Sequence, residues 1–181
     1  MLKYNLRYFK IYILLCIPCI AWASTLEYQV KTSFIYNFML FTQWPNSAFD
    51  NTEDDTIYIC TIGETNYIPE LDTLLDQKVD QKKIKITVIL NRLYDAEVDS
   101  CQVMVFGQEE KKYTNKVLNQ VSKTSILTVG ESEKFLEMGG HINFLIINNT
   151  VQFEINQKAI EAAGLSISSK VLRLANKVIS N

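Results

Sequence analysis

The middle of the chain alternates between two periodicities. Short apolar runs of strand length are separated by stretches whose apolar residues repeat at helical spacing, from residue 57 to residue 138. Strands linked by helices form a mainly parallel sheet, because each connection must cross a face of the sheet to reach the next strand. The expected strands cover residues 57–62, 84–90, 102–106 and 125–129, and the expected helices cover residues 69–77, 109–122 and 131–138.

A helix precedes this alternating region. It is expected over residues 26–43, and Pro45 ends it because proline cannot continue a helix. One broad apolar stripe is expected to face the core: Leu26, Val30, Phe34, Phe38 and Phe41, with Ile35 and Met39 alongside.

The C-terminal third departs from the alternation. The apolar runs 142–147 and 151–155 are separated by Asn148-Asn149-Thr150, and asparagine tolerates the positive φ of a tight turn, so an antiparallel hairpin is expected. Helices are expected at residues 157–163 and 168–179. The predicted fold class is therefore α/β: a single domain whose mainly parallel sheet is flanked by helices and ends in a C-terminal antiparallel hairpin.

Residues 1–23 have the three parts of a signal peptide. Basic residues precede an apolar core over residues 11–20, and Ala21-Trp22-Ala23 forms a small-x-small cleavage site. An apolar run of about 12 residues is too short to span a bilayer, which needs roughly 20. We therefore expect cleavage before Ser24 and a mature domain of residues 24–181 in the periplasm.

Removal of this leader changes the charge balance. The leader holds three of the 18 basic residues and none of the 20 acidic ones, so the mature chain has 15 basic and 20 acidic residues and a net charge of −5. Such a balance argues against nucleic acid or anionic lipid as the main partner.

Two cysteines remain after cleavage, Cys60 and Cys101. An even number in an oxidising compartment is the composition expected of one structural disulfide. Two separate buried thiols are the alternative interpretation. A catalytic redox pair is less favoured, because the mature chain has no C-x-x-C.

Residue types typical of catalysis or metal binding are sparse. His141 is the only histidine, so no site of several histidines can form. We interpret it as a turn or strand-edge residue, and a pH-sensitive contact with a partner is the alternative. The sequence has no nucleophile elbow, zinc-protease motif or phosphate-binding loop, so no catalytic residue, metal or cofactor is expected. Gly63, Gly107 and Gly130 are interpreted as glycines of strand-ending turns.

Several ordered blocks of the sequence together resemble the YfiR/HmsC-like family of periplasmic proteins over nearly the whole mature chain. The first is V-K-T-S-F-I-Y-N-F-M-L-F-T-Q-W-P, and the last is A-G-L-S-I-S-S-K-V-L-R-L-A. The blocks between them are I-C-T-I-G, C-Q-V-M-V-F, I-L-T-V-G, G-G-H-I-N-F and F-E-I-N. The most specific match is the set of blocks from I-L-T-V-G to the last one.

The resemblance implies a regulator that acts by binding. Relatives repress membrane-bound diguanylate cyclases by binding the periplasmic sensor domain, and an outer-membrane lipoprotein or envelope stress removes them. An inner-membrane diguanylate cyclase is therefore the implied partner, an outer-membrane lipoprotein a further one, and a homodimer is common for such folds. The resemblance also implies that Cys60 and Cys101 pair, whereas a second cysteine pair that some relatives carry near the hairpin is absent here.

The partner surface is expected in the C-terminal region, from the hairpin through the last helix, with Glu154, Ile160, Leu165 and Leu172 as candidate residues. Ordinary core packing is the alternative for the three apolar residues, and solvation is the alternative for Glu154. Two other functions stay open. One is a small-molecule-sensing module with its crevice at the carboxyl ends of the strands, beside the three glycines named above. The other is a thiol-based envelope enzyme.

Overall fold

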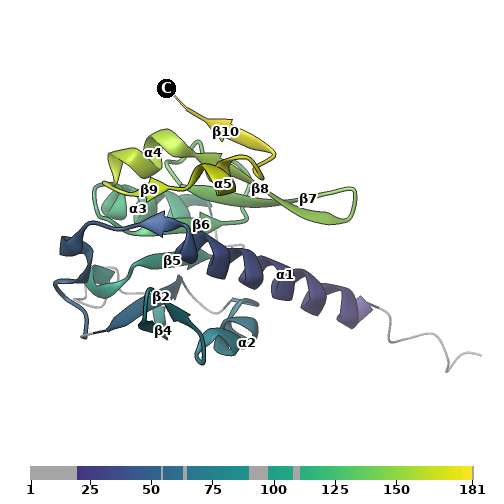
Figure 1. Ribbon diagram of the computed structural model, residues 1–181. Coiled ribbons are helices and arrows are strands. Elements are labelled where there is room, and N and C mark those ends of the chain that lie inside the picture. Colours follow the sequence, from purple (N-terminus) through teal and green to yellow (C-terminus); the bar gives the residue numbers. More distant parts are fainter. Residues whose placement is uncertain (1–19, 54, 63–64, 90–97, 108–110, 181) are drawn as a thin grey trace, which may run out of the picture.

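A computed structural model describes residues 20–53, 55–62, 65–89, 98–107 and 111–180 of the chain. Its centre is an eight-stranded sheet (Figure 1). The strand order is β10 (Lys177–Ile179), β8 (Thr150–Asn156), β7 (Ile142–Ile147), β6 (Leu127–Gly130), β5 (Val103–Phe106), β2 (Thr56–Ile62), β4 (Lys82–Ile89) and β3 (Lys78–Val79). Outside this sheet, β1 (Thr42–Gln43) pairs antiparallel with β9 (Ser166–Ile167).

Five neighbouring strands of the sheet, from β4 to β7, run parallel. The short edge strand β3 is antiparallel to β4, and β8 is antiparallel to β7. All four residues of β5 and all four of β6 are buried, as expected for parallel strands covered on both faces. The predicted α/β fold with a mainly parallel sheet is confirmed.

Each face of the sheet has its own apolar cluster. Along β2, Ile57 and Ile59 belong to one cluster, whereas Cys60 and Ile62 belong to the other, because successive side chains point to opposite faces. α3 (Lys111–Val121) packs on the cysteine face. The opposite face is covered by α1 (Ile20–Leu40), α2 (Ile68–Leu71), α4 (Gln157–Ala162) and α5 (Ser169–Leu172). Three short 3₁₀ helices lie in connections: η1 (Asn46–Phe49), η2 (Asp72–Leu74) and η3 (Val98–Ser100).

The C-terminal hairpin is confirmed. β7 and β8 pair with Phe144 opposite Phe153. Asn148 and Asn149 form the turn with φ of 49° and 59°, the left-handed conformation that a two-residue hairpin turn needs. Both phenylalanines also contact Phe38 of α1, at ring-centroid distances of 5.9 and 4.9 Å, so the hairpin is fixed against this helix.

The buried face of α1 agrees with the predicted stripe at Ile35, Phe38 and Met39, which are all buried. It differs at Leu26, which is 62% exposed, and at Lys31, which is buried although it was not part of the stripe. The helix carries apolar residues on most of its circumference, so spacing alone did not exclude Leu26 from the packed face.

Three predicted helices are wrong in whole or in part. The helix predicted over residues 69–77 is limited to the single turn α2 and the 3₁₀ helix η2, which ends at Leu74. Residues 131–138 form consecutive turns, and the positive φ of Lys134 (65°) interrupts helical geometry there. The helix predicted over residues 168–179 is limited to the single turn α5, and the chain then becomes β10. Asn176 N donates to Phe153 O at 2.8 Å, so bonding to the open edge of β8 replaces the helix.

Candidate functional site

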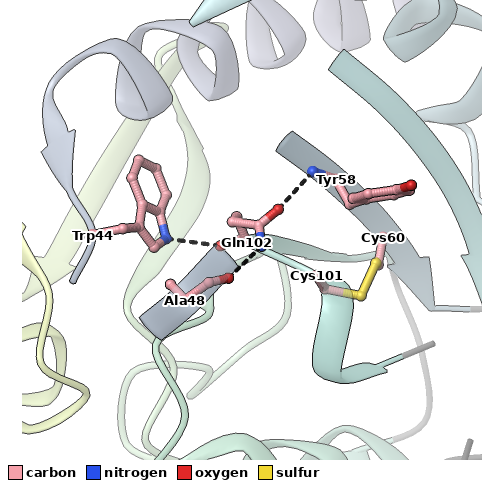
Figure 2. Close-up of a disulfide and its surroundings, with 6 residues drawn as sticks. All are labelled: Trp44, Ala48, Tyr58, Cys60, Cys101 and Gln102. Atoms are coloured by element: carbon pink, nitrogen blue, oxygen red, sulfur yellow. Dashed lines mark hydrogen bonds between the residues drawn. A yellow bond between two sulfur atoms is a disulfide. The ribbon is translucent and has the colours of Figure 1, made fainter. Parts of the chain in front are cut away.

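A disulfide joins Cys60 of β2 to Cys101, two residues before β5 (Figure 2). The two Cα atoms are 5.9 Å apart and both residues are buried. The pairing that the resemblance implied is therefore present. The bond holds the start of β5 against the neighbouring strand β2.

Gln102, next to this disulfide, is buried and bonded through its amide and its backbone (Figure 2). Its side-chain oxygen accepts from Tyr58 N, and its side-chain nitrogen donates to Ala48 O, both at 2.7 Å. Its carbonyl oxygen accepts from Trp44 Nε1 at 3.3 Å and from Leu127 N at 2.8 Å. One residue thus connects η1, β2, β6 and the segment after α1.

A buried ionic cluster lies where α1 crosses the carboxyl end of β6. Lys31 of α1 forms salt bridges with Glu131, which directly follows β6, and with Glu27 one turn earlier on α1. The side chains of Lys31 and Glu131 are 3% and 4% exposed. The Tyr28 and Tyr67 hydroxyls donate to the two carboxylate oxygens of Glu131 at 3.1 and 3.2 Å.

The pKa directions keep Lys31 charged and Tyr67 protonated near neutral pH. Burial lowers the pKa of Lys31, but its bonds to Glu131 and Glu27 outweigh burial, so the pKa ends above its ordinary value. Burial, and then the nearby Glu131 carboxylate, raise the pKa of Tyr67 well above its ordinary value. The cluster fastens α1 to the sheet and has its donors directed at one carboxylate.

Neither Gln102 nor the Lys31–Glu131 pair was predicted from the sequence. A polar residue next to an apolar strand, as in C-Q-V-M-V-F, and a lysine within the apolar helix block V-K-T-S-F-I were the available signals. Neither signal identifies the partner, because the contacting residues are distant in sequence.

The predicted partner-binding residues fall into two groups. Ile160 and Leu165 are 0% and 3% exposed and belong to the core, so neither presents surface to a partner in this structure. Leu172 is partly buried, and Glu154 is half-buried beside Lys177 in the register of β8 with β10. The prediction of a C-terminal partner surface now depends on the latter two residues and on neighbours that the sequence analysis did not name.

The most exposed large apolar side chain in the described part of the chain is Leu174, at 71%. It directly follows α5, and the exposed basic residues Lys170, Arg173 and Lys177 lie on the same short segment. Lys170 also places its Nζ 5.7 Å from the ring centroid of Phe41, at the end of α1. We refer to Lys170, Leu172, Arg173, Leu174 and Lys177 as the α5 surface.

Two cavities lie at the amino ends of the strands. One, of about 330 Å³, has Trp44 and Phe49 among its walls together with Ile57, Asp80 and Lys82. The other, of about 200 Å³, lies beside Cys101. The carboxyl ends of β2, β4 and β5, where the sensing alternative placed its crevice, adjoin residues 63–64, 90–97 and 108–110, which are outside the described residues. Among the expected turn glycines, Gly130 ends β6 and Gly107 follows β5, whereas Gly63 is outside the described residues.

His141 directly precedes β7, which is the strand-edge position predicted for it. The residue is 2% exposed and bonds to Thr128 of β6. No group of three or more potential metal ligands was found within the ranges that the structure describes. Likewise, none of the described helices is long and apolar enough to cross a bilayer.

The fold and these sites define a class: a small α/β protein braced by a disulfide, with a buried ionic cluster between α1 and the end of β6. The chain belongs to the YfiR/HmsC-like family, whose model matches residues 28–176. Members of this family are periplasmic regulators of cyclic-di-GMP signalling and are not known as enzymes. No curated protein matches the chain with significant similarity.

Proposed function

We propose that this protein is a periplasmic negative regulator that binds the sensor domain of an inner-membrane diguanylate cyclase and lowers cyclic-di-GMP output and biofilm formation. Membership of the YfiR/HmsC-like family over residues 28–176 carries the proposal. The proposal includes export by the leader over residues 1–23, which lies almost entirely outside the described residues.

The α5 surface supports a binding mode for this role. An exposed leucine surrounded by cationic side chains is complementary to an apolar patch with acidic neighbours on another protein. A regulator of this kind needs only to bind the inactive cyclase more tightly than the active one, and a difference of about 1.4 kcal/mol shifts the balance tenfold. We propose the α5 surface together with Glu154 as the contact region.

Deletion of the gene tests the regulatory role. Cellular cyclic-di-GMP should rise, and a plasmid copy with its leader should restore the low level. No rise, in a strain whose cyclase carries a periplasmic domain, would refute the repressor role.

A pair of leucine variants tests the contact region in the same deletion strain. Leu174→Asp should accumulate normally but fail to lower cyclic-di-GMP. Leu75→Asp is the matched control, because Leu75 is also exposed (47%) and follows α2, away from α5 (Figure 1). Full repression by Leu174→Asp would exclude the α5 surface from the contact.

A small-molecule-sensing module is a second candidate, and the cavity between Trp44 and Phe49 favours it. Aromatic walls with a few polar groups at the rim are typical of ligand sites. Stabilisation of the mature protein by a small molecule, without a membrane protein that co-purifies with it, would favour this function over the repressor.

A further inference from the structure

His141 joins the parallel sheet to the C-terminal part of the chain. Its Nδ1 accepts from the backbone N–H of Thr128 at 3.1 Å, and its own backbone N–H donates to Thr128 Oγ1 at 3.0 Å. The ring also interacts with the backbone of Ala159 in α4, and this hydrogen bond raises the pKa of His141. The His141 carbonyl oxygen accepts from Asn156 N at 2.8 Å. A single residue therefore bonds to β6, to the end of β8 and to α4.

These bonds require a neutral imidazole. A second ring proton would sit on Nδ1 and face the Thr128 N–H, which is also a donor, so the bond between them would be lost. The residue is 2% exposed, so water does not solvate a charged ring in the folded state. Burial lowers the pKa of His141 to about 4, and the hydrogen bond with the Ala159 backbone opposes this only in part.

The elements around His141 supply no counter-charge. Neither β6 nor β7 contains an ionisable side chain. Glu154 of β8 is half-buried, and Lys158 and Glu161 of α4 and Glu137 in the preceding turns are exposed. None of these four forms a salt bridge within the described part of the chain, and Glu161 accepts instead from Gln157 at 2.8 Å.

We propose that protonation of His141 releases the C-terminal unit, from β7 to β10, from the parallel sheet when the surroundings become acidic. Only two register pairs, Val129 with Ile142 and Gly130 with Asn143, join β6 to β7, and Thr128 lies directly before them. Loss of the His141 bonds therefore weakens a short ladder at its start. Because this unit carries the α5 surface, release would also free the partner, a consequence that depends on the proposed function.

Titration of the ring tests the first step. His141 is the only histidine in the sequence, so its imidazole NMR signal in the mature protein is unambiguous. The signal should report a neutral ring between pH 7 and 6 and should change only together with loss of structure in β7 and β8. A ring that titrates near the ordinary value of about 6.5 with the fold unchanged would overturn the proposal.

Hydrogen exchange tests the release itself. An opening that takes up one proton becomes about tenfold more favourable per pH unit below the ordinary histidine pKa. Between pH 6.5 and 4.5, protection of the β7 and β8 amides, corrected for intrinsic exchange rates, should therefore fall by up to about 100-fold more than protection in β2 and β5. Equal losses in the two sets of strands would overturn the proposal.

His141→Asn is the matched variant, because the asparagine oxygen can replace Nδ1 as acceptor for Thr128 N and does not titrate. The additional pH dependence of β7 and β8 should disappear in this variant, and its persistence would contradict the proposal. If the variant fails to fold, the proposal is still tested in the unmodified protein, by comparing the pH dependence of amide protection in β7 and β8 with that in β2 and β5. All these measurements use the isolated mature protein, so their outcome is independent of the repressor role.

Discussion

Gln102 connects four segments through one buried amide and its backbone. Its replacement by an apolar residue of similar size should therefore lower the free energy of unfolding. In Gln102→Met, Tyr58 N and Ala48 O would lose these partners in part-buried surroundings. A buried polar group without a partner costs about 1–3 kcal/mol, so we expect the free energy of unfolding to fall by about 2–4 kcal/mol. Urea unfolding measures the change, with the exposed Gln120→Met on α3 as the control. A change equal to that of the control would show that water satisfies both groups.

The effects of Lys31 and Glu131 on the free energy of unfolding should depend on each other. Lys31→Met leaves a buried carboxylate without its cation, and loss of one partner of a buried pair typically costs 3–5 kcal/mol. The double variant Lys31→Met with Glu131→Gln removes both charges and should recover part of this loss, as measured in a double-mutant cycle by urea unfolding. Additive effects of the two substitutions would mean that the two side chains act independently.

Residue contacts of this kind lie beyond local sequence patterns. The hairpin turn was predictable because the two asparagines determine their own backbone conformation. The contacts of Gln102 and Lys31 were not predictable, because their partners lie 44 and 100 residues away in the sequence. Cys60 and Cys101 were foreseen from compartment and count, whereas Ile160 and Leu165 were misplaced because helical spacing does not distinguish a core face from a partner face.

At the level of elements, alternating periodicity predicted the parallel sheet because each element carries its own signal. β10 carried none: Lys177–Ile179 follows a one-turn helix, and only the open edge of β8 makes it a strand. Tertiary bonding outweighed helix propensity there. The same explanation applies to the turns at residues 131–138, where the Phe135 ring packs against Gly130 and Gly140 and leaves no room for a Cβ atom at either position.

The disulfide acts at this level, because it fixes β2 to the start of β5. Closure of a loop with a sequence separation of 41 residues stabilises by about 4 kcal/mol in the chain-entropy model. Cys60→Ser with Cys101→Ser should therefore lower the free energy of unfolding by roughly this amount. Urea unfolding with and without a reducing agent measures it, since the reductant should weaken the unmodified protein and leave the double variant unchanged. A reductant-insensitive midpoint in the unmodified protein would contradict this role.

Over the whole molecule, charge is unevenly distributed. Residues 150–181 contain four basic and two acidic residues, a net charge of +2, whereas residues 24–149 contain eleven basic and eighteen acidic residues, a net charge of −7. The basic part includes the α5 surface and its exposed Leu174. An acidic partner would therefore approach the C-terminal part and be repelled by the rest, which orients the encounter.

Charge reversal on α5 tests this orientation. Lys170→Glu with Arg173→Glu should weaken repression of cyclic-di-GMP in the complemented deletion strain, and we expect about tenfold weaker partner binding, roughly 1.4 kcal/mol. Lys123→Glu with Lys134→Glu makes the same change in net charge at exposed positions outside the C-terminal part. If net charge alone mattered, both double variants would lose repression equally; if the α5 surface is the contact, only the first loses it. Because exposed charges are screened by salt, the difference between the two should shrink as ionic strength rises during purification of the complex from membranes.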